Sequence, residues 1–199
     1  MKSHNGSGTT IKRGPGYILV QSMTLARIPL SVLFLIIRLY GKNADLTLAL
    51  SLLLLIIIEF TDAFDGKIAR RFGLASEYGA TLDPFADSIS RLIIYWALAM
   101  TNNVIFLVPL VMAVRDVTVA YSRIVLAQNN QTVSAKLSGK VKASIQAAGS
   151  FLALLGPLYW DTIGYWSFYA LSWLLITVTF LSAIEYVKDA LTTLRKNEF

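Results

Sequence analysis

Long apolar runs are the feature of this sequence that most limits what it can fold into. The clearest run, LTLALSLLLLIII at residues 46–58, contains no charged residue. The chain of 199 residues is 55% hydrophobic and 15% charged, whereas soluble domains carry about 25% charged residues. A run of about 20 mostly apolar residues is long enough to cross a bilayer as a helix. The sequence therefore predicts an all-α integral membrane protein.

Polar breaks divide the apolar sequence into six segments. They lie at about residues 17–40, 45–70, 76–100, 104–127, 141–160 and 163–187. We expect one transmembrane helix from each segment, and together they form a bundle of six helices in a single domain, residues 17–187. This prediction leaves a polar N-terminal tail at residues 1–16 and a C-terminal tail at residues 188–199, with no cleavable signal peptide evident.

The placement of lysine and arginine predicts the orientation of the bundle. With six spans, both termini and the loops after the second and fourth spans share one side of the membrane. That side would hold thirteen basic residues: Lys2, Lys12, Arg13, Lys67, Arg70, Arg71, Arg123, Lys136, Lys140, Lys142, Lys188, Arg195 and Lys196. The opposite side would hold only Arg38 and Lys42. Because positive residues are enriched in cytoplasmic loops, we expect cytoplasmic termini and a multi-pass protein of the inner (cytoplasmic) membrane.

Charge and composition argue against several classes of function. The net charge is +6, which in a soluble protein would suggest nucleic acid. In a membrane protein it suits anionic lipid headgroups and anionic substrates instead, and we expect no nucleic acid partner. The chain has no cysteine, which excludes disulfides and thiolate chemistry, and its one histidine, His4, lies in the polar tail.

Four aspartates follow the run at 46–58, at the predicted cytoplasmic face. Asp62 and Asp65 are three residues apart, and Asp83 and Asp87 are four apart, so each pair shares one face of a helix. Four carboxylates clustered in a low-dielectric place repel one another and would be driven to protonate. Bound divalent cations remove that cost, and Mg²⁺ favours carboxylate and phosphate oxygens. Ordinary surface charge on a solvated loop, the alternative, does not account for the helical spacing.

Small residues and one arginine accompany the aspartates. Gly66 follows the second aspartate directly, Ala69 comes one turn later, and Gly79 lies one turn before the third aspartate. A glycine inside a helix costs about 1 kcal/mol relative to alanine. Close approach of a bulky ligand is one reason to keep it, and close helix packing is the alternative. Arg70 can pair with a phosphate.

This stretch resembles the signature of the CDP-alcohol phosphotransferase family. The pattern D-x2-D-G-x2-A-R-x8-G-x3-D-x3-D, from Asp62 to Asp87, agrees at all eight defined positions. The six-helix plan and the length also agree, so the resemblance covers nearly the whole chain. Members of the family cleave the pyrophosphate of a CDP-linked lipid or alcohol. They join the phosphoryl-lipid part to an acceptor hydroxyl and release CMP.

The resemblance implies a role for each residue of the motif. One or two Mg²⁺ or Mn²⁺ ions would be held by the four aspartates, Asp62, Asp65, Asp83 and Asp87. Asp87 would also be the candidate base for the acceptor hydroxyl. The site of the CDP-lipid would be lined by Asp62, Gly66, Ala69, Arg70 and Gly79. A homodimer is a further expectation from the family.

Further residues resemble one branch, the phosphatidylglycerophosphate synthases. The first helix of that branch often begins N-x2-T-x2-R, and QSMTLAR here has glutamine in the first position. This match assigns Thr24 and Arg27 to the CDP-lipid site. The fourth-helix pattern R-E-x2-V-x3-R reads RDVTVAYSR from Arg115 to Arg123. The L-G-K-x-K loop reads LSGKVK, with one serine inserted.

Four basic residues in these two patterns predict a pocket for a phosphorylated acceptor. Arg115 and Arg123 are a little over two helical turns apart, and Lys140 and Lys142 lie at the start of the fifth span. Glycerol 3-phosphate needs such cations, whereas choline or serine would not need so many. Anchoring of the lysines at the cytoplasmic face is the alternative. We expect phosphatidyl transfer from CDP-diacylglycerol to glycerol 3-phosphate, with direct attack by the acceptor hydroxyl.

One position departs from the branch and leaves the acceptor open. Many members have lysine directly after the fourth aspartate, where this chain has Ser88, and Arg91 could replace it or signal another acceptor. Inositol 1-phosphate is the closest rival because it also carries a phosphate. A cation transporter also places acids inside a helical bundle. It would not need the fixed spacing of Gly66, Ala69 and Arg70, and such proteins often contain internal repeats, which this sequence lacks.

Overall fold

The protein is all-helical over the residues that the structure, a computed structural model, describes. These are residues 15–71, 77–129 and 137–197, of which the side chains of 15–21, 63, 65–71, 77–81 and 196–197 lie outside the description. The helices in this part are α1 (Pro15–Tyr40), α2 (Ala44–Arg71), α3 (Glu77–Met100), α4 (Leu107–Gln128), α5 (Leu137–Leu155), η1 (Gly156–Leu158), α6 (Trp160–Ile163) and α7 (Trp166–Asn197). The predicted all-α class is therefore confirmed, and the six long helices correspond to the six expected segments.

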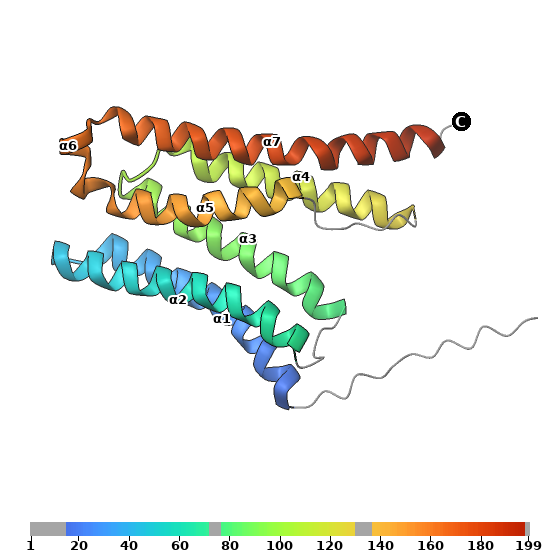
Figure 1. The fold of residues 1–199 in the computed structure, drawn as a ribbon, viewed down its shortest axis with the longest axis horizontal. Coiled ribbons are helices and arrows are strands. Elements are labelled where there is room, and N and C mark those ends of the chain that lie inside the picture. Colours follow the sequence, from blue (N-terminus) through green and yellow to red (C-terminus); the bar gives the residue numbers. More distant parts are fainter. Residues whose placement is uncertain (1–14, 72–76, 130–136, 198–199) are drawn as a thin grey trace, which may run out of the picture.

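The long helices pack as two groups of three (Figure 1). Helices α1, α2 and α3 form the first group, and α4, α5 and α7 form the second. Helix α3 also touches α4 and α5, and α2 touches α5, so these contacts form the seam between the groups. The site described below lies along this seam.

Apolar side chains fill the interior and also cover much of the outside. The buried core takes residues from both groups, among them Phe34, Leu55, Leu98, Met112 and Leu154. Large apolar side chains also remain exposed on the surface, including Leu33, Leu53, Trp173, Leu174 and Phe180. A surface rich in exposed leucine and aromatic residues suits contact with lipid rather than with water.

Within the described residues, four segments are long and apolar enough to cross a membrane. They are Ser22–Tyr40, Ala44–Asp62, Leu137–Leu158 and Trp166–Arg195. They support a multi-pass membrane protein. Helices α3 and α4 do not join them because charged residues recur along their length, such as Asp87 and Arg91 in α3 and Arg115 and Arg123 in α4. Six spans were expected, and four are supported by length and composition.

Local sequence signals explain the turns at the end of the bundle remote from the aspartates. Asn43 precedes α2 and accepts a hydrogen bond from the backbone N–H of Leu46 at 3.0 Å, as a helix-capping side chain does. Between α3 and α4, Asn102 adopts a left-handed backbone conformation with φ 55°, which asparagine tolerates better than most residues. The Asn103 side chain donates to the Ala153 carbonyl at 2.8 Å and fixes this turn to α5.

Two helix boundaries differ from the expected ones. Helix α5 begins at Leu137, inside the segment that was expected to be a polar loop. Helix α7 continues to Asn197, well past the expected end of the last span near residue 187. The sequence after Val187 has neither glycine nor proline, and Ala190 and Thr193 are buried. The helix therefore extends because it still has an inner face to pack.

Candidate active site

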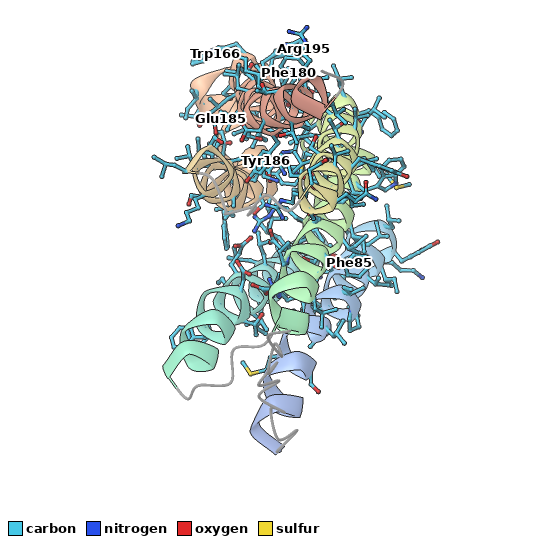
Figure 2. The ribbon with its side chains drawn as sticks, turned by 90° about the vertical axis from the view of Figure 1, so that its right-hand side faces the viewer. Phe85, Trp166, Phe180, Glu185, Tyr186 and Arg195 are labelled. Atoms are coloured by element: carbon cyan, nitrogen blue, oxygen red, sulfur yellow. The ribbon has the colours of Figure 1, made fainter. Side chains whose placement is uncertain are left out.

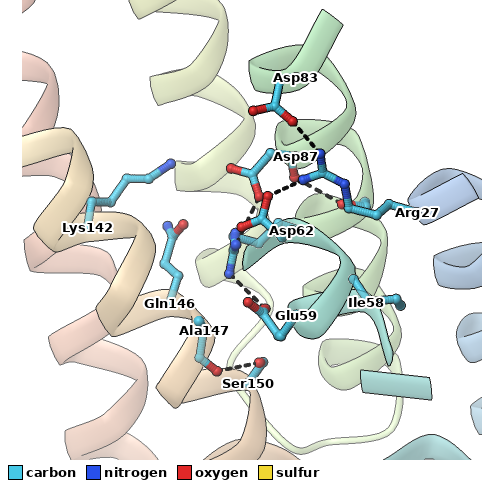
Figure 3. Close-up of polar contacts among 12 residues, drawn as sticks. Arg27, Ile58, Glu59, Asp62, Asp83, Asp87, Lys142, Gln146, Ala147 and Ser150 are labelled. Atoms are coloured by element: carbon cyan, nitrogen blue, oxygen red, sulfur yellow. Dashed lines mark hydrogen bonds and ion pairs between the residues drawn. The ribbon is translucent and has the colours of Figure 1, made fainter. Parts of the chain in front are cut away.

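Acidic side chains from α2 and α3 face one another at the seam and form what we call the acidic cluster. It consists of Glu59, Asp62, Asp83 and Asp87 with two arginines, Arg27 and Arg91 (Figure 3). The helical spacing expected from the sequence brings the carboxylates together. Asp62 lies near enough to Asp83 and Asp87 for their charges to interact.

Arg27 bridges the two helices that carry the acids. It projects from α1 with only 1% of its surface exposed, and one guanidinium nitrogen bonds Asp62 while another bonds Asp83. The two carboxylates come from different helices, so a single side chain links α1, α2 and α3. The match to the branch motif assigned Arg27 to the CDP-lipid site, and the structure places it directly against two of the expected metal ligands.

Arg91 makes the second link within the acidic cluster. It donates to Asp87 Oδ1 at 2.9 Å, one turn earlier on α3, and to Glu59 Oε1 at 3.1 Å on α2. Glu59 itself lies one turn before Asp62. The buried guanidinium therefore fixes the orientation of the Asp87 carboxylate, the candidate base.

The acidic cluster holds more negative than positive charge. Its described members are four carboxylates and two guanidiniums. In the part of the chain with described side chains, no three acidic groups are arranged so that they could hold a metal ion. The hard oxygen donors and the unbalanced charge nevertheless suit a divalent cation such as Mg²⁺. Arg27 now lies between Asp62 and Asp83, and the side chain of the fourth expected ligand, Asp65, is outside the description.

Basic side chains from the second group of helices form a contrasting site, the basic cluster. It consists of Arg115 and Arg123 of α4 and Lys142 of α5, together with one carboxylate, Asp116. Arg115 bonds Asp116 Oδ1 at 2.8 Å, and the Lys142 ammonium lies 3.4 Å from the same oxygen. Two of the three cations thus share one carboxylate, which leaves positive charge for an incoming anion.

Helix α7 supports the two arginines from behind. Arg115 Nε donates to Ser182 Oγ at 2.9 Å. Both guanidiniums lie over the ring of Tyr186, one turn further along the same helix. Because α7 was expected only to span the membrane, sequence reasoning missed its part in this site.

The two predicted lysines of the acceptor pocket lie in different surroundings. Lys142 is 6% exposed, whereas Lys140 is exposed to solvent. Residues two apart on a helix point in nearly opposite directions. Only one of the pair can therefore face the interior, and the structure brings Lys142, but not Lys140, against Asp116.

Lys142 also connects the two clusters. Figure 3 shows it extending from α5 toward the acidic cluster, and its ammonium lies near enough to Asp87 for their charges to attract. Ser88 follows Asp87 on α3, and its hydroxyl lies within hydrogen-bonding reach of Asp116. A serine at this position leaves space in which a lysine from another helix approaches the acids.

The remaining expected residues are only partly described. Thr24 is buried in α1, 4% exposed. The described helices include the positions of five other motif residues, but their side chains lie outside the description: Asp65, Gly66, Ala69, Arg70 and Gly79.

Two residues of the site went unnoticed in the sequence. Glu59 shares a face of α2 with Asp62, and this spacing of three residues could have identified it. Tyr186 offered no comparable signal, because one tyrosine in an aromatic-rich apolar helix resembles its neighbours. Only the packing of α7 against α4 distinguishes it.

Comparison with known proteins agrees with the family resemblance found in the sequence. A protein-family model described as CDP-alcohol phosphatidyltransferase matches residues 17–183. The chain is 30% identical over 182 residues to a Mycobacterium tuberculosis protein named "probable phosphatidylglycerophosphate synthase", with 87% of this chain and 81% of the relative covered. It is 28% identical over 187 residues to the CDP-diacylglycerol–glycerol-3-phosphate 3-phosphatidyltransferase of Rickettsia typhi, covering 92% and 99% of the two chains. The enzyme of that same name from Bacillus subtilis is 28% identical over 183 residues, covering 84% and 92%.

Proposed function

The chain belongs to the CDP-alcohol phosphatidyltransferase family, and from this premise we propose that it transfers a phosphatidyl group from CDP-diacylglycerol to glycerol 3-phosphate. The products are CMP and a phosphatidylglycerol phosphate lipid. Named relatives act on glycerol 3-phosphate, which supports this acceptor over inositol 1-phosphate.

One observation carries the proposal: a cluster with excess negative charge lies beside a cluster with excess positive charge. The described acidic cluster has four carboxylates to two guanidiniums. The basic cluster has three cations and one carboxylate, Asp116, which contacts two of them. The first suits a divalent cation with a diphosphate, and the second suits the phosphate of an acceptor. A cation transporter has no use for the second cluster.

The acceptor is held by the basic cluster. Its phosphate is bound by Arg115, Arg123 and Lys142, with Lys140 at the exposed rim. Lys142 extends toward Asp87, so an acceptor anchored there presents its hydroxyl to the acidic cluster. The CDP-lipid approaches from the first group of helices, where Thr24 and Arg70 contribute to its site, while its acyl chains stay in lipid.

The chemistry is a single displacement at phosphorus. Asp87 accepts the proton of the acceptor hydroxyl, and the hydroxyl oxygen attacks the lipid-side phosphorus. The phosphoanhydride bond to the cytidylate breaks, and CMP leaves with the bonding electrons. Arg91 orients Asp87 through their 2.9 Å contact. Net retention of configuration at phosphorus would contradict this route.

We propose that Asp62, Asp65, Asp83 and Asp87 hold one or two Mg²⁺ or Mn²⁺ ions. When bound, such an ion supplies positive charge that stabilises the diphosphate and the departing phosphate. Arg27 bonds both Asp62 and Asp83, so a metal held by these carboxylates would lie beside its guanidinium.

We also propose six spans, with α3 and α4 crossing the membrane inside the bundle. Both termini and the active site then face the cytoplasm, at the inner membrane, and the positive-inside distribution of lysine and arginine supports this orientation. A homodimer is proposed as well, and the mass of the purified protein in detergent tests it.

The decisive experiment offers the purified protein CDP-diacylglycerol and Mg²⁺ with glycerol 3-phosphate, inositol 1-phosphate, inositol, serine or choline. CMP release is followed for each. We expect release with glycerol 3-phosphate, and its loss when the metal is chelated. Faster release with inositol 1-phosphate would replace the proposed acceptor, and no release with any of them would remove the proposed activity.

A further inference from the structure

Tyr186 holds an unusual position for a tyrosine in a membrane-exposed helix. It is 1% exposed and among the largest fully buried side chains. Figure 2 shows it pointing from α7 into the space between α4 and α5. The guanidinium carbons of Arg115 and Arg123 lie 5.9 and 5.3 Å from its ring centre. The residue therefore contacts the basic cluster rather than lipid.

The ring offsets an unfavourable arrangement of charge. Two guanidiniums near one side chain repel each other, and the negative face of an aromatic ring attracts both of them. Arg123 Nη2 also donates to the Tyr186 hydroxyl at 3.4 Å. The tyrosine thus attracts both cations and contacts Arg123 through its hydroxyl.

Arg123 has unused capacity for an anion. Arg115 is paired with Asp116 and Ser182. Among the described residues, Arg123 has no carboxylate partner, and its Nε is buried without a hydrogen-bond acceptor. A buried, unmet donor on a cation is costly unless a ligand satisfies it.

Helix α5 closes over the same tyrosine at a glycine. A Cβ added at Gly139 would lie 3.4 Å from the Tyr186 hydroxyl and 4.0 Å from Arg115 Nη2. The hydroxyl therefore lies beside α5 as well as against Arg123 of α4.

We propose that Tyr186 is a positioning residue of the acceptor site. Its ring holds Arg115 and Arg123 as a preformed pair that receives the phosphate of the acceptor alcohol. The inference rests on the proposed function of the basic cluster, and it adds α7 to the machinery that selects a phosphorylated acceptor. Tyr186 acts through the arginines and takes no part in the bonds that form or break.

The test compares Tyr186→Leu, which removes the ring, with Tyr186→Phe, which removes only the hydroxyl. Tyr169→Leu, an exposed tyrosine near the start of α7, is the matched control. We expect Tyr186→Leu to raise the KM for glycerol 3-phosphate about tenfold, as the loss of a desolvated cation–π contact implies. The KM for CDP-diacylglycerol should stay unchanged, and Tyr186→Phe should recover most of the affinity.

A second readout does not depend on turnover. Glycerol 3-phosphate should protect the wild type against thermal unfolding in detergent, glycerol should not, and Tyr186→Leu should lose this protection. If Tyr186→Leu does not fold, Tyr186→Met takes its place, because it also removes the ring, and the same rise in the KM for glycerol 3-phosphate is expected.

The outcomes separate the inference from the proposed function. Equal changes in both KM values, or a wild-type KM for glycerol 3-phosphate in Tyr186→Leu (in Tyr186→Met if it is the variant used), would overturn the positioning role. Wild-type protein that glycerol 3-phosphate protects but that releases no CMP would contradict the proposed function alone. Wild-type protein that shows neither this protection nor CMP release with glycerol 3-phosphate would overturn both.

Discussion

The acidic and basic clusters are built from different halves of the molecule and carry net charges of opposite sign. The acidic cluster takes its residues from α1, α2 and α3, and its two arginines offset part of the negative charge. The basic cluster takes its residues from α4 and α5 with support from α7, and a single carboxylate and an aromatic ring separate its cations. Each cluster contains groups of the opposite charge, yet each keeps a net charge.

The difference assigns separate tasks to the two halves. The acidic cluster should govern the chemical step and the donor, so damage there should lower kcat. The basic cluster should govern acceptor binding, so damage there should raise the KM for glycerol 3-phosphate. Lys142, which reaches across the seam, is where the two effects should mix.

The largest expected effect comes from removing the candidate base. Asp87→Asn should lower kcat by at least about 100-fold, since general bases contribute about 10²–10⁴-fold to rate. CMP release at saturating substrates measures this effect. Asp161→Asn, an exposed aspartate at the opposite end of the bundle, is the control. Near-normal activity in Asp87→Asn would refute the assignment of Asp87.

The next effect concerns stability in the acidic half. Arg91→Leu should destabilise the protein by about 3 kcal/mol because Glu59 and Asp87 lose a buried partner. Arg195→Leu, at an exposed site on α7, should change stability little. Thermal unfolding in detergent compares the two variants. Equal stability would mean that the acidic cluster does not depend on its internal cation.

Arg123→Gln tests the basic half. The KM for glycerol 3-phosphate should rise about tenfold or more, as the loss of a charge-assisted hydrogen bond implies. The KM for CDP-diacylglycerol should not change. Steady-state kinetics with each substrate varied in turn measure both values. A fall in kcat with an unchanged acceptor KM would break the division of tasks between the halves.

The smallest expected effect comes from comparing the two lysines of α5. Lys140→Met should change the acceptor KM less than about threefold, because exposed charges contribute little. Lys142→Met should raise it by about tenfold or more, since Lys142 is buried beside Asp116. Equal effects of the two substitutions would show that burial does not distinguish these lysines.

The acidic half was easier to predict from the sequence than the basic half. Helical spacing placed Asp62, Asp83 and Asp87 together, because the period of a helix fixes which residues share a face. The long apolar runs likewise predicted the helices. The arginine partners were not predictable, since the contact of Arg27 with Asp62 and Asp83 depends on how three helices pack.

The basic half depends on contacts between helices that are distant in sequence. The basic residues themselves could be identified, but nothing in the sequence assigned Tyr186 to Arg115 and Arg123. Lys140 and Lys142 differ in exposure because of how α5 is rotated about its axis. The sequence did not reveal this rotation, since the fifth helix was expected to begin only at residue 141. Helix α5 starts earlier than expected, so both lysines lie on a helix.

The bridging arginine of α1 bears on how the protein is made. Arg27 comes from α1, which leaves the ribosome before α2 and α3, and it bonds acids on those two helices. Chains fold in segments as they emerge. The first three helices can therefore satisfy charges among themselves before the last three are synthesised, and the second group then brings its own counter-charge in Asp116. The reactive seam forms only once both groups of helices have been synthesised and meet.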